Sequence, residues 1–204
     1  MSGTHDHIPP GNQAPVPDRP PDDHRTPDDQ RAPGAPSPWI TRHAGSLPEQ
    51  GQVLDLAAGS GRHTRYFSQL GRAVLAVDRD VAGLADLSAT AGVEIVELDL
   101  EAAYGWPFPG RQFAGIVVTN YLHRPLLPFL GGALQPGGLL LYETFALGNE
   151  RFGRPSNPAF LLQPGELLRV AQAAALTVLA YEHGEVTSPR PAVIQRIAAQ
   201  KHAG

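Results

Sequence analysis

The fold is decided by the stretch Val53-Leu54-Asp55-Leu56-Ala57-Ala58-Gly59-Ser60-Gly61, an apolar segment that leads into a Gly-x-Gly turn. The residues that follow it, 62–67, favour a helix. Glycines at such a strand-to-helix turn let the backbone approach a ligand closely, because they carry no Cβ and adopt a positive φ at little cost. The stretch therefore predicts a strand, a turn and a helix, with a nucleotide-like ligand at the turn.

A second apolar segment, residues 73–77, ends at Asp78. In Rossmann-type units an acid about 20 residues after the Gly turn accepts hydrogen bonds from the ribose hydroxyls. Thr64 stands where the dinucleotide fingerprint has Gly or Ala, and the chain has no Gly-Lys-Ser or Gly-Lys-Thr loop. The pattern predicts Asp78 as a ribose ligand and gives no support for phosphate binding.

Strand-like and helix-like segments continue to alternate along the chain, which predicts a mainly parallel sheet wrapped by helices. Asn120 to Pro125 follow the fourth predicted strand, at the edge where open α/β sheets place their active sites. The expected strands are 53–57, 73–77, 93–98, 113–119, 138–145, about 176–181 and about 192–199, and the expected helices are a lead-in through Ala44, then 62–70, 81–90, 122–134 and one that begins at Pro164.

The segment Asp55–Gly61 resembles the first motif of class I S-adenosylmethionine-dependent methyltransferases, acid-x-Gly-x-Gly-x-Gly, with Ala57 in place of the first glycine. The turn Pro136-Gly137-Gly138 is similar to the one that enters the fifth strand of these enzymes. The resemblance spans roughly residues 39–200. It implies a Rossmann-like three-layer α/β sandwich, with a mostly parallel seven-stranded sheet, an antiparallel last strand and helices on both faces.

Within that family the chain resembles the tellurite-resistance methyltransferase-like subgroup, through Asp55–His63, Asn120–Pro125 and Glu143–Phe145. The resemblance implies S-adenosyl-L-methionine as cofactor, S-adenosyl-L-homocysteine as product and no metal. It places the aminocarboxypropyl tail at Asp55 and the Gly turn, the ribose at Asp78 and the adenine amino group at Asp99. The expected cofactor-binding residues are Asp55, Ala57, Gly59, Gly61, Asp78, Asp99, Leu100 and Asn120.

Each of these assignments has a structural alternative. Asp55 can stabilise the turn, Asp78 can cap the next helix, and Glu101 competes with Asp99. Asn120 can serve as a turn residue. Arg62 and His63 could reach the cofactor carboxylate, although surface exposure is favoured for both.

The acceptor side has one candidate catalytic residue, His123, whose imidazole has an unperturbed pKa near neutrality and could act as a general base. The alternative is that His123 packs against or caps the next helix. Arg124 could bind an anionic acceptor or could pair with Glu143. The insertion 148–158 is rich in Gly, Pro, Asn and Arg, so it is expected to cover the acceptor pocket, or else to be an inert surface loop. The expected substrate residues are Tyr121, Arg124, Tyr142, Arg151, Phe152 and Arg154.

Composition sets further limits on a chain of 204 residues with 21 prolines and no cysteine. Residues 1–38 contain few large apolar side chains and are expected to form a disordered tail, which leaves 39–204 as one methyltransferase domain. The lack of cysteine excludes disulfides and thiolate zinc sites, and His5 and His7 of the tail do not form a metal site. No segment has the features of a secretory signal or a membrane span, so a cytoplasmic protein is expected.

The function that these patterns favour is methyl transfer to a small-molecule acceptor. The net charge of −4 disfavours a broad RNA-binding surface, although RNA remains a second candidate acceptor and protein a third. A noncatalytic S-adenosylmethionine-binding protein is a further alternative. A nicotinamide oxidoreductase is disfavoured by Thr64 and by the Pro136-Gly137-Gly138 turn.

Overall fold

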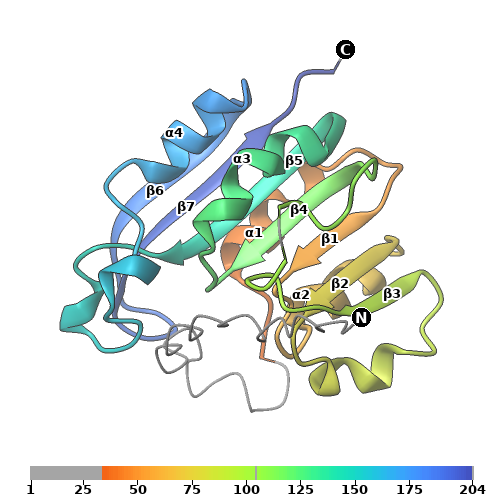
Figure 1. The fold of residues 1–204 in the computed structure, drawn as a ribbon, viewed down its shortest axis with the longest axis horizontal. Coiled ribbons are helices and arrows are strands. Elements are labelled where there is room, and N and C mark those ends of the chain that lie inside the picture. Colours follow the sequence, from red (N-terminus) through yellow and green to blue (C-terminus); the bar gives the residue numbers. More distant parts are fainter. Residues whose placement is uncertain (1–33, 104, 204) are drawn as a thin grey trace, which may run out of the picture.

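The computed structural model describes residues 34–103 and 105–203 (Figure 1). Seven strands form one sheet in the order β3-β2-β1-β4-β5-β7-β6. All pairs from β3 to β5 are parallel, and β7 runs antiparallel to both of its neighbours. The expected α/β fold is therefore confirmed. The strands are β1 (Val53–Leu56), β2 (Val74–Asp78), β3 (Val93–Glu97), β4 (Phe113–Thr119), β5 (Leu134–Phe145), β6 (Thr177–Val186) and β7 (Ala192–Gln200).

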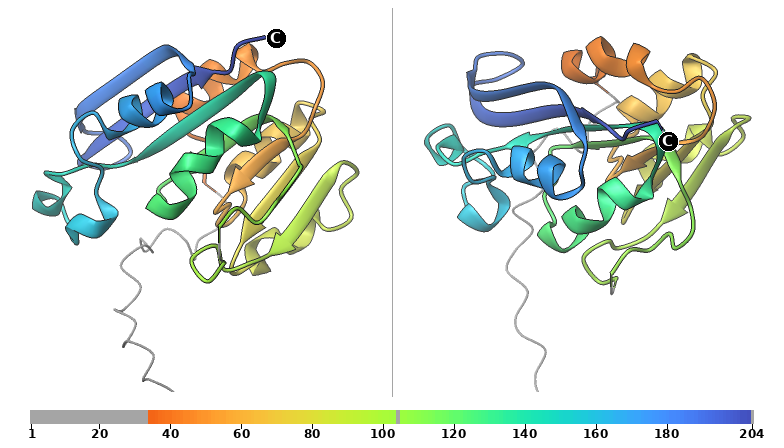
Figure 2. Two further views of the ribbon diagram at one scale, coloured as in Figure 1. Left: turned by 45° about the horizontal axis from the view of Figure 1, so that its top comes forward. Right: turned by 90° about the horizontal axis from the view of Figure 1, so that it is seen from above.

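Helices cover both faces of this sheet, as the view from above in Figure 2 shows. The helices α1 and α2 lie on one face, and α3 and α4 lie on the other. The α-helices are α1 (Pro38–His43), α2 (Arg62–Gln69), α3 (Leu127–Ala133) and α4 (Glu166–Ala173), and the 3₁₀ helices are η2 (Ala44–Ser46), η3 (Ala82–Leu87), η4 (Arg124–Leu126), η5 (Asn149–Arg151) and η6 (Pro158–Phe160).

The strands separate two apolar cores because successive side chains point to opposite faces. On β5, Leu140 and Tyr142 join the larger core beneath α3 and α4, whereas Leu139 and Leu141 join the core beneath α1 and α2. Trp39 of α1 is buried in the second core. The central strands are thus buried on both faces, and this explains their nearly continuous apolar sequences.

Two expected helices are much shorter in the structure. The segment 81–90 forms only the 3₁₀ helix η3, and the Ser88 hydroxyl donates a 2.8 Å hydrogen bond to the carbonyl of Ala85, a local bond that competes with helix continuation. The segment 122–134 forms η4 and then α3, which starts after Pro125 and ends as β5 begins. Proline favours a first helical turn and not a helix interior, so it divides this segment.

Strand β5 begins four residues before the expected start at residue 138, and the Pro136-Gly137-Gly138 turn lies inside it. The pairing of β4 with β5 shifts register between Phe113 and Gly115 at this point. Gly138 sits so tightly that a Cβ there would lie 2.8 Å from the carbonyl oxygen of Gln135 and 2.9 Å from that of Phe113. The turn is therefore an irregularity within the strand, and Gly138 is required by space.

Regular structure begins before the expected boundary between residues 38 and 39. Ser37 is 4% exposed and caps α1, because its hydroxyl oxygen accepts a 3.2 Å hydrogen bond from the backbone N–H of Trp39. The rest of the expected tail, residues 1–33, lies outside the described residues. Within 34–103 and 105–203, no helix is long and apolar enough to span a bilayer.

Two glycine substitutions test the packing of β5. We expect Gly138→Ala to lower the free energy of unfolding by about 1–3 kcal/mol, because the new methyl group meets two backbone carbonyls. The control is Gly132→Ala on the exposed side of α3, where nothing lies within 4 Å of the new Cβ. Alanine should be neutral there or stabilise the helix by up to about 1 kcal/mol. Urea unfolding measures both, and equal midpoints would contradict the packing interpretation.

Candidate functional site

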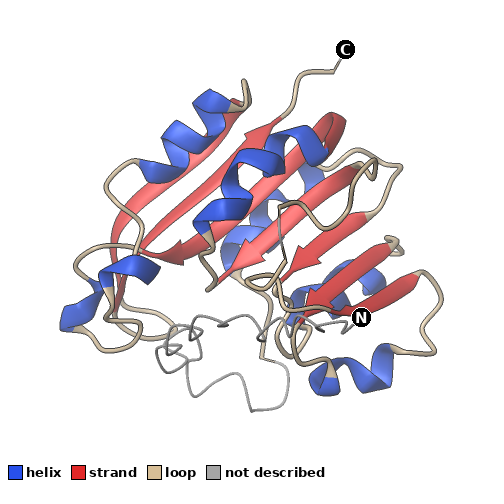
Figure 3. Ribbon diagram, viewed as in Figure 1, coloured by secondary structure: helices blue, strands red, loops and turns tan. Residues whose placement is uncertain are grey.

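The loops that follow β1, β2, β3 and β4 gather at one edge of the sheet, the carboxyl edge (Figure 3). The strand order reverses there, since β1 lies between β2 and β4. Open α/β sheets bind ligands at such a point, outside the carboxyl ends of their strands. The residues expected to bind the cofactor come from these loops.

Asp55 is 2% exposed near the end of β1 and faces α2. Its Oδ2 accepts a 2.6 Å hydrogen bond from the Thr64 hydroxyl, and its carboxylate also accepts the backbone N–H of Thr64. Burial raises the pKa of Asp55 to about 6, and the two Thr64 bonds and the charge of Arg62 partly oppose that rise. Asp55 therefore fixes the first turn of α2 against β1. This is the turn-stabilising role that the sequence offered as an alternative for Asp55.

The Gly turn combines three residues at positive φ: Ala57 at 58°, Gly59 at 55° and Gly61 at 79°. A Cβ on Gly61 would lie 2.2 Å from Cδ2 of Leu84, so packing against η3 excludes a larger residue. A Cβ on Gly59 would have no neighbour within 4 Å, so the backbone there is open to a ligand. Ala57, in place of the family glycine, adopts the left-handed conformation at a cost of about 1–2 kcal/mol.

Asp78 ends β2 and joins it to the Gly turn. Its Oδ2 accepts a 2.7 Å hydrogen bond from the Gly59 N–H, and its Oδ1 accepts a 3.0 Å bond from the Asp80 N–H. Asp78 is half-buried, and each carboxylate oxygen offers a second lone pair. The structure thus brings Asp78 and the turn together while leaving acceptor capacity for a further donor.

The next two loops place Asp99 and Asn120 at the same edge. Oδ1 of Asp99 accepts a 3.0 Å hydrogen bond from the Glu101 N–H, so its carboxylate is partly engaged in a local turn. The Leu100 side chain is 4% exposed and packs in the larger core, and its contact with the cofactor stays a prediction. Asn120 is exposed, has a φ of 55° and donates its N–H to the carbonyl of Glu143 at 3.0 Å, which is turn geometry.

Two tyrosines lie behind this edge. Tyr142, expected to contact the acceptor, is 2% exposed, and its hydroxyl donates a 2.8 Å hydrogen bond to the carbonyl of Tyr121, so it supports the edge from within the core. Burial raises the pKa of both phenols, and the carboxylates of Glu101, Asp99 and Asp78 raise that of Tyr121 further. The carboxylates that follow β2 and β3 therefore lie close enough to the Tyr121 hydroxyl to disfavour its ionisation.

Arg124 is an anchor for the following segment. Its guanidinium forms a two-point ion pair with Glu166 of α4, at 2.8 and 3.0 Å, and not with Glu143 as one alternative expected. It also donates to the carbonyls of Ala159 and Leu161. His123 is half-buried just before η4, where its carbonyl accepts the Leu126 N–H at 3.0 Å and its side chain makes no capping bond.

The insertion after β5 is held against the first residues of β7. Asn149 is 2% exposed, donates to the Pro155 carbonyl at 3.0 Å and accepts the Val193 N–H at 3.2 Å. Arg151 pairs with Glu185 of β6 at 2.7 Å and lies over the exposed Phe152 ring. Arg151 and Phe152 therefore lie toward β6 and β7, away from the Gly turn that follows β1. Arg154 is exposed on the same insertion.

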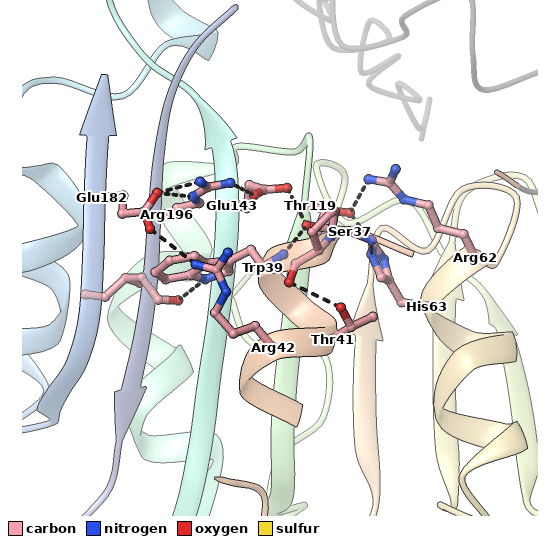
Figure 4. Close-up of polar contacts among 12 residues, drawn as sticks. Ser37, Trp39, Thr41, Arg42, Arg62, His63, Thr119, Glu143, Glu182 and Arg196 are labelled. Atoms are coloured by element: carbon pink, nitrogen blue, oxygen red, sulfur yellow. Dashed lines mark hydrogen bonds and ion pairs between the residues drawn. The ribbon is translucent and has the colours of Figure 1, made fainter. Parts of the chain in front are cut away.

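A buried histidine joins the amino-terminal segment to the Gly turn, although exposure was favoured from the sequence. His63 is 1% exposed; its Nε2 accepts a 3.1 Å hydrogen bond from the Ser37 N–H, and its Nδ1 lies 3.5 Å from the Thr119 hydroxyl (Figure 4). Burial and the neighbouring charge of Arg62 lower the pKa of His63 to about 3. His63 is therefore neutral.

A polar row crosses four strands beside this histidine, and sequence reasoning missed it. Thr119, Glu143, Arg196 and Glu182 are successive register partners on β4, β5, β7 and β6. Arg196 donates to Glu143 at 3.2 Å and to Glu182 at 2.9 Å, and the Ser37 hydroxyl donates to Glu143 at 2.9 Å (Figure 4). Thr119 ends β4, but the other three lie inside their strands, so only the register of the strands brings the four together.

A family model described as "Methyltransferase domain" matches residues 53–138, the part of the chain that contains the Gly turn and the acids of the carboxyl edge. No curated protein sequence matches the chain significantly. Within 34–103 and 105–203, no group of three or more His, Asp or Glu side chains is arranged to hold a metal ion.

Solved methyltransferase structures share the fold. TehB from Haemophilus influenzae has a TM-score of 0.62 at 21% identity, over 80% of this chain and 61% of TehB, so this chain spans less than two thirds of that protein. The 1,6-didemethyltoxoflavin-N1-methyltransferase of Burkholderia thailandensis, solved with its acceptor and S-adenosylhomocysteine, has a TM-score of 0.58 at 23% identity, over 80% and 76%. A SAM-dependent methyltransferase from Methanosarcina mazei has a TM-score of 0.62 at 16% identity, over 83% and 100%.

The opposite pKa shifts of Asp55 and His63 predict a pH signature. The raised pKa of Asp55 means that its contribution to stability is complete below about pH 4 and is lost as the pH rises to about 6. The lowered pKa of His63 means that its contribution is complete above about pH 6.5 and is lost as the pH falls toward 3. Between pH 4 and 6 the two effects oppose each other.

We therefore expect the unfolding free energy of Asp55→Asn to rise with pH between pH 4 and 6 more steeply than that of the wild type, by up to about 1.4 kcal/mol per pH unit. His63→Gln should change the slope in the opposite direction. Urea unfolding at several pH values measures both slopes. Parallel profiles for the three proteins would show that these groups do not titrate as the structure indicates.

Proposed function

We propose that this chain, which belongs to the class I S-adenosylmethionine-dependent methyltransferases, transfers a methyl group from S-adenosyl-L-methionine to a small-molecule acceptor. The observation that carries the proposal is the joining of Asp78 to Gly59 by a 2.7 Å hydrogen bond at the point where the strand order reverses. An acid and an open Gly turn at that point suit a nucleoside with a short polar tail.

The residues of the carboxyl edge fit the parts of this cofactor. Asp78 keeps free lone pairs for the ribose hydroxyls, and Asp99 lies one strand further out, where it could accept the adenine amino group. The open backbone at Gly59 leaves room for the amino-acid tail. Asn120 and Tyr121 follow β4 on the other side of the turn, where Asn120 would contact the cofactor and Tyr121 the acceptor.

When bound, the cofactor supplies an electrophilic methyl carbon on a sulfonium. The protein needs to align the acceptor with that carbon, and alignment alone supplies a large share of the acceleration. The acceptor atom forms the new bond to carbon as the carbon–sulfur bond breaks and leaves a thioether. In this proposal His123, half-buried before η4, takes the proton that the acceptor loses.

A small acceptor is supported by the structure of the insertion and by overall charge. Asn149 and Arg124 hold the insertion beside the end of β5, so the insertion would cover a small acceptor there, although its Phe152 side chain lies toward β6 and β7. The 1,6-didemethyltoxoflavin-N1-methyltransferase that shares this fold was solved with a small molecule, 1,6-didemethyltoxoflavin, bound. The net charge of −4 and the lack of cysteine support an acceptor other than RNA and a cytoplasmic location.

Ligand-induced thermal shifts test the cofactor directly. We expect S-adenosylmethionine and S-adenosylhomocysteine to stabilise the protein, by about 2.7 kcal/mol at 100 times the dissociation constant, and NAD to have no comparable effect. Asp78→Asn should reduce the response, because one anionic acceptor is lost while the bond from Gly59 can persist. The control is Glu94→Ala, which removes a carboxylate paired with Arg111 on the exposed surface. A full response in Asp78→Asn would reject the ribose assignment.

The acceptor class and the base can be identified with labelled cofactor. We expect label to enter the small-molecule fraction of a cell extract and not its RNA or protein, and a protein that binds the cofactor without any transfer would be noncatalytic. With the acceptor identified, His123→Ala should lower the rate about 10²–10⁴-fold and remove the pH dependence that a general base gives to the rate. An unchanged pH–rate profile would remove His123 from catalysis.

A further inference from the structure

The guanidinium of Arg65 joins three segments beside the carboxyl edge of the sheet. Arg65 lies in the first turn of α2, and its side chain is half-buried. Its Nη1 donates to the carbonyl of Ser60 in the Gly turn, and its Nη2 donates to the carbonyl of Gly83 in η3 at 3.0 Å. Nη2 also pairs with the exposed carboxylate of Asp86, near the end of η3. One side chain of α2 therefore holds both the Gly turn and η3.

The Gly turn and η3 are also in direct contact with each other. A Cβ on Gly61 would lie 2.2 Å from Cδ2 of Leu84 in η3 and 2.8 Å from Nη1 of Arg65. A Cβ on Gly83 would lie 3.0 Å from Cα of Ser60, which is backbone and cannot move aside as the end of a side chain can. The two segments interlock through these glycines, so a displacement of η3 would displace the turn.

A chain of hydrogen bonds leads from the start of η3 to Asp78. The Asp80 carboxylate accepts the Ala82 N–H at 3.1 Å, and Oδ1 of Asp78 accepts the Asp80 N–H at 3.0 Å. Oδ2 of Asp78 accepts the Gly59 N–H at 2.7 Å, which returns the chain of bonds to the Gly turn. The turn and the segment that contains η3 are therefore joined at two places, through the Asp78 carboxylate and through the guanidinium.

We propose that Arg65 is a positioning residue for the nucleoside of S-adenosylmethionine. The inference rests on the proposed function and adds a residue that acts through Asp78 and the Gly turn. Groups that bind a ligand must be held to within about 0.5 Å by the residues behind them. The joint at Arg65 keeps Asp78 at a fixed distance from the open backbone at Gly59. The planar fork of a guanidinium suits this task, because it can donate to several carbonyls at once.

Two ligands that share the nucleoside test this proposal. Calorimetry on the full chain measures the affinities of S-adenosylhomocysteine and of 5′-methylthioadenosine, which lacks the amino acid. We expect Arg65→Ala to weaken both by about 10-fold, because the ribose site is displaced in either case. Arg65→Lys should recover only part of the loss, since an ammonium lacks the planar fork. Gly83→Ala, which pushes η3 away from Ser60, should weaken both ligands as well.

A double-mutant cycle separates positioning from a general loss of stability. Because Arg65 acts through Asp78 in this proposal, Arg65→Ala should cost much less affinity in an Asp78→Asn background than in the wild type. Partial unfolding lowers the fraction of molecules that bind, which calorimetry reports as the stoichiometry, and it does not produce this coupling.

Two controls keep the joint between the Gly turn and η3 intact. Asp86→Ala removes only the exposed ion pair and leaves both carbonyl bonds of Arg65. Arg72→Ala removes a guanidinium that contacts the Pro48 carbonyl beyond the other end of α2. Both variants should bind the two ligands as the wild type does.

The possible outcomes distinguish this proposal from the proposed function. Additive losses from Arg65→Ala and Asp78→Asn, or unchanged affinities in Arg65→Ala, would overturn the proposal and leave the proposed function intact. A loss confined to S-adenosylhomocysteine would overturn it too, because the effect would then lie at the amino-acid tail. If the wild-type protein binds neither ligand, the proposed function itself is wrong.

Discussion

The burial of the Asp55 carboxylate against Thr64 is the constraint on which the site depends. The 2.6 Å hydrogen bond ties the end of β1 to the first turn of α2, and the chain between them is too short to relax independently. The Gly turn must therefore pass through the left-handed region three times. That path presents the Gly59 N–H to Asp78 and leaves the backbone at Gly59 open.

Much of this arrangement could be predicted from the sequence, because it follows from local patterns. Apolar segments that carry Asp55 and Asp78 near their carboxyl ends, with the Gly turn after the first, specify a parallel β-α-β unit and the edge where its acids meet. Helix lengths were predicted less well. Pro125 divides the helix expected over 122–134, and the helix expected over 81–90 forms only η3, which packs against the Gly turn. Pro125 and the Ser88 hydroxyl act locally, and the packing of Leu84 against Gly61 joins distant segments; the periodicity of apolar residues encodes neither effect.

The contacts of the side chains on the acceptor side could not be predicted from the sequence either. Tyr142 and Arg124 have residue types suited to binding a substrate, yet one supports Tyr121 from the core and the other joins η4 to α4 through Glu166. The row from Thr119 to Glu182 is encoded only in strand register, since its four members lie on four strands. Ser37 meets that row from a segment of low apolar content, so composition gave no indication that it is buried.

The neutrality of His63 determines where negative charge can be bound near the turn. Full burial and the adjacent guanidinium both oppose protonation of its ring, so the imidazole acts as a polar spacer that accepts from Ser37 and faces Thr119. Arg65 is neutralised by Asp86. The positive field beside Gly59 and Gly61 therefore comes mainly from Arg62 and the amino end of α2. An anionic tail is attracted to that corner, while the acids at the ends of β2 and β3 repel it and favour hydroxyl and amino donors instead.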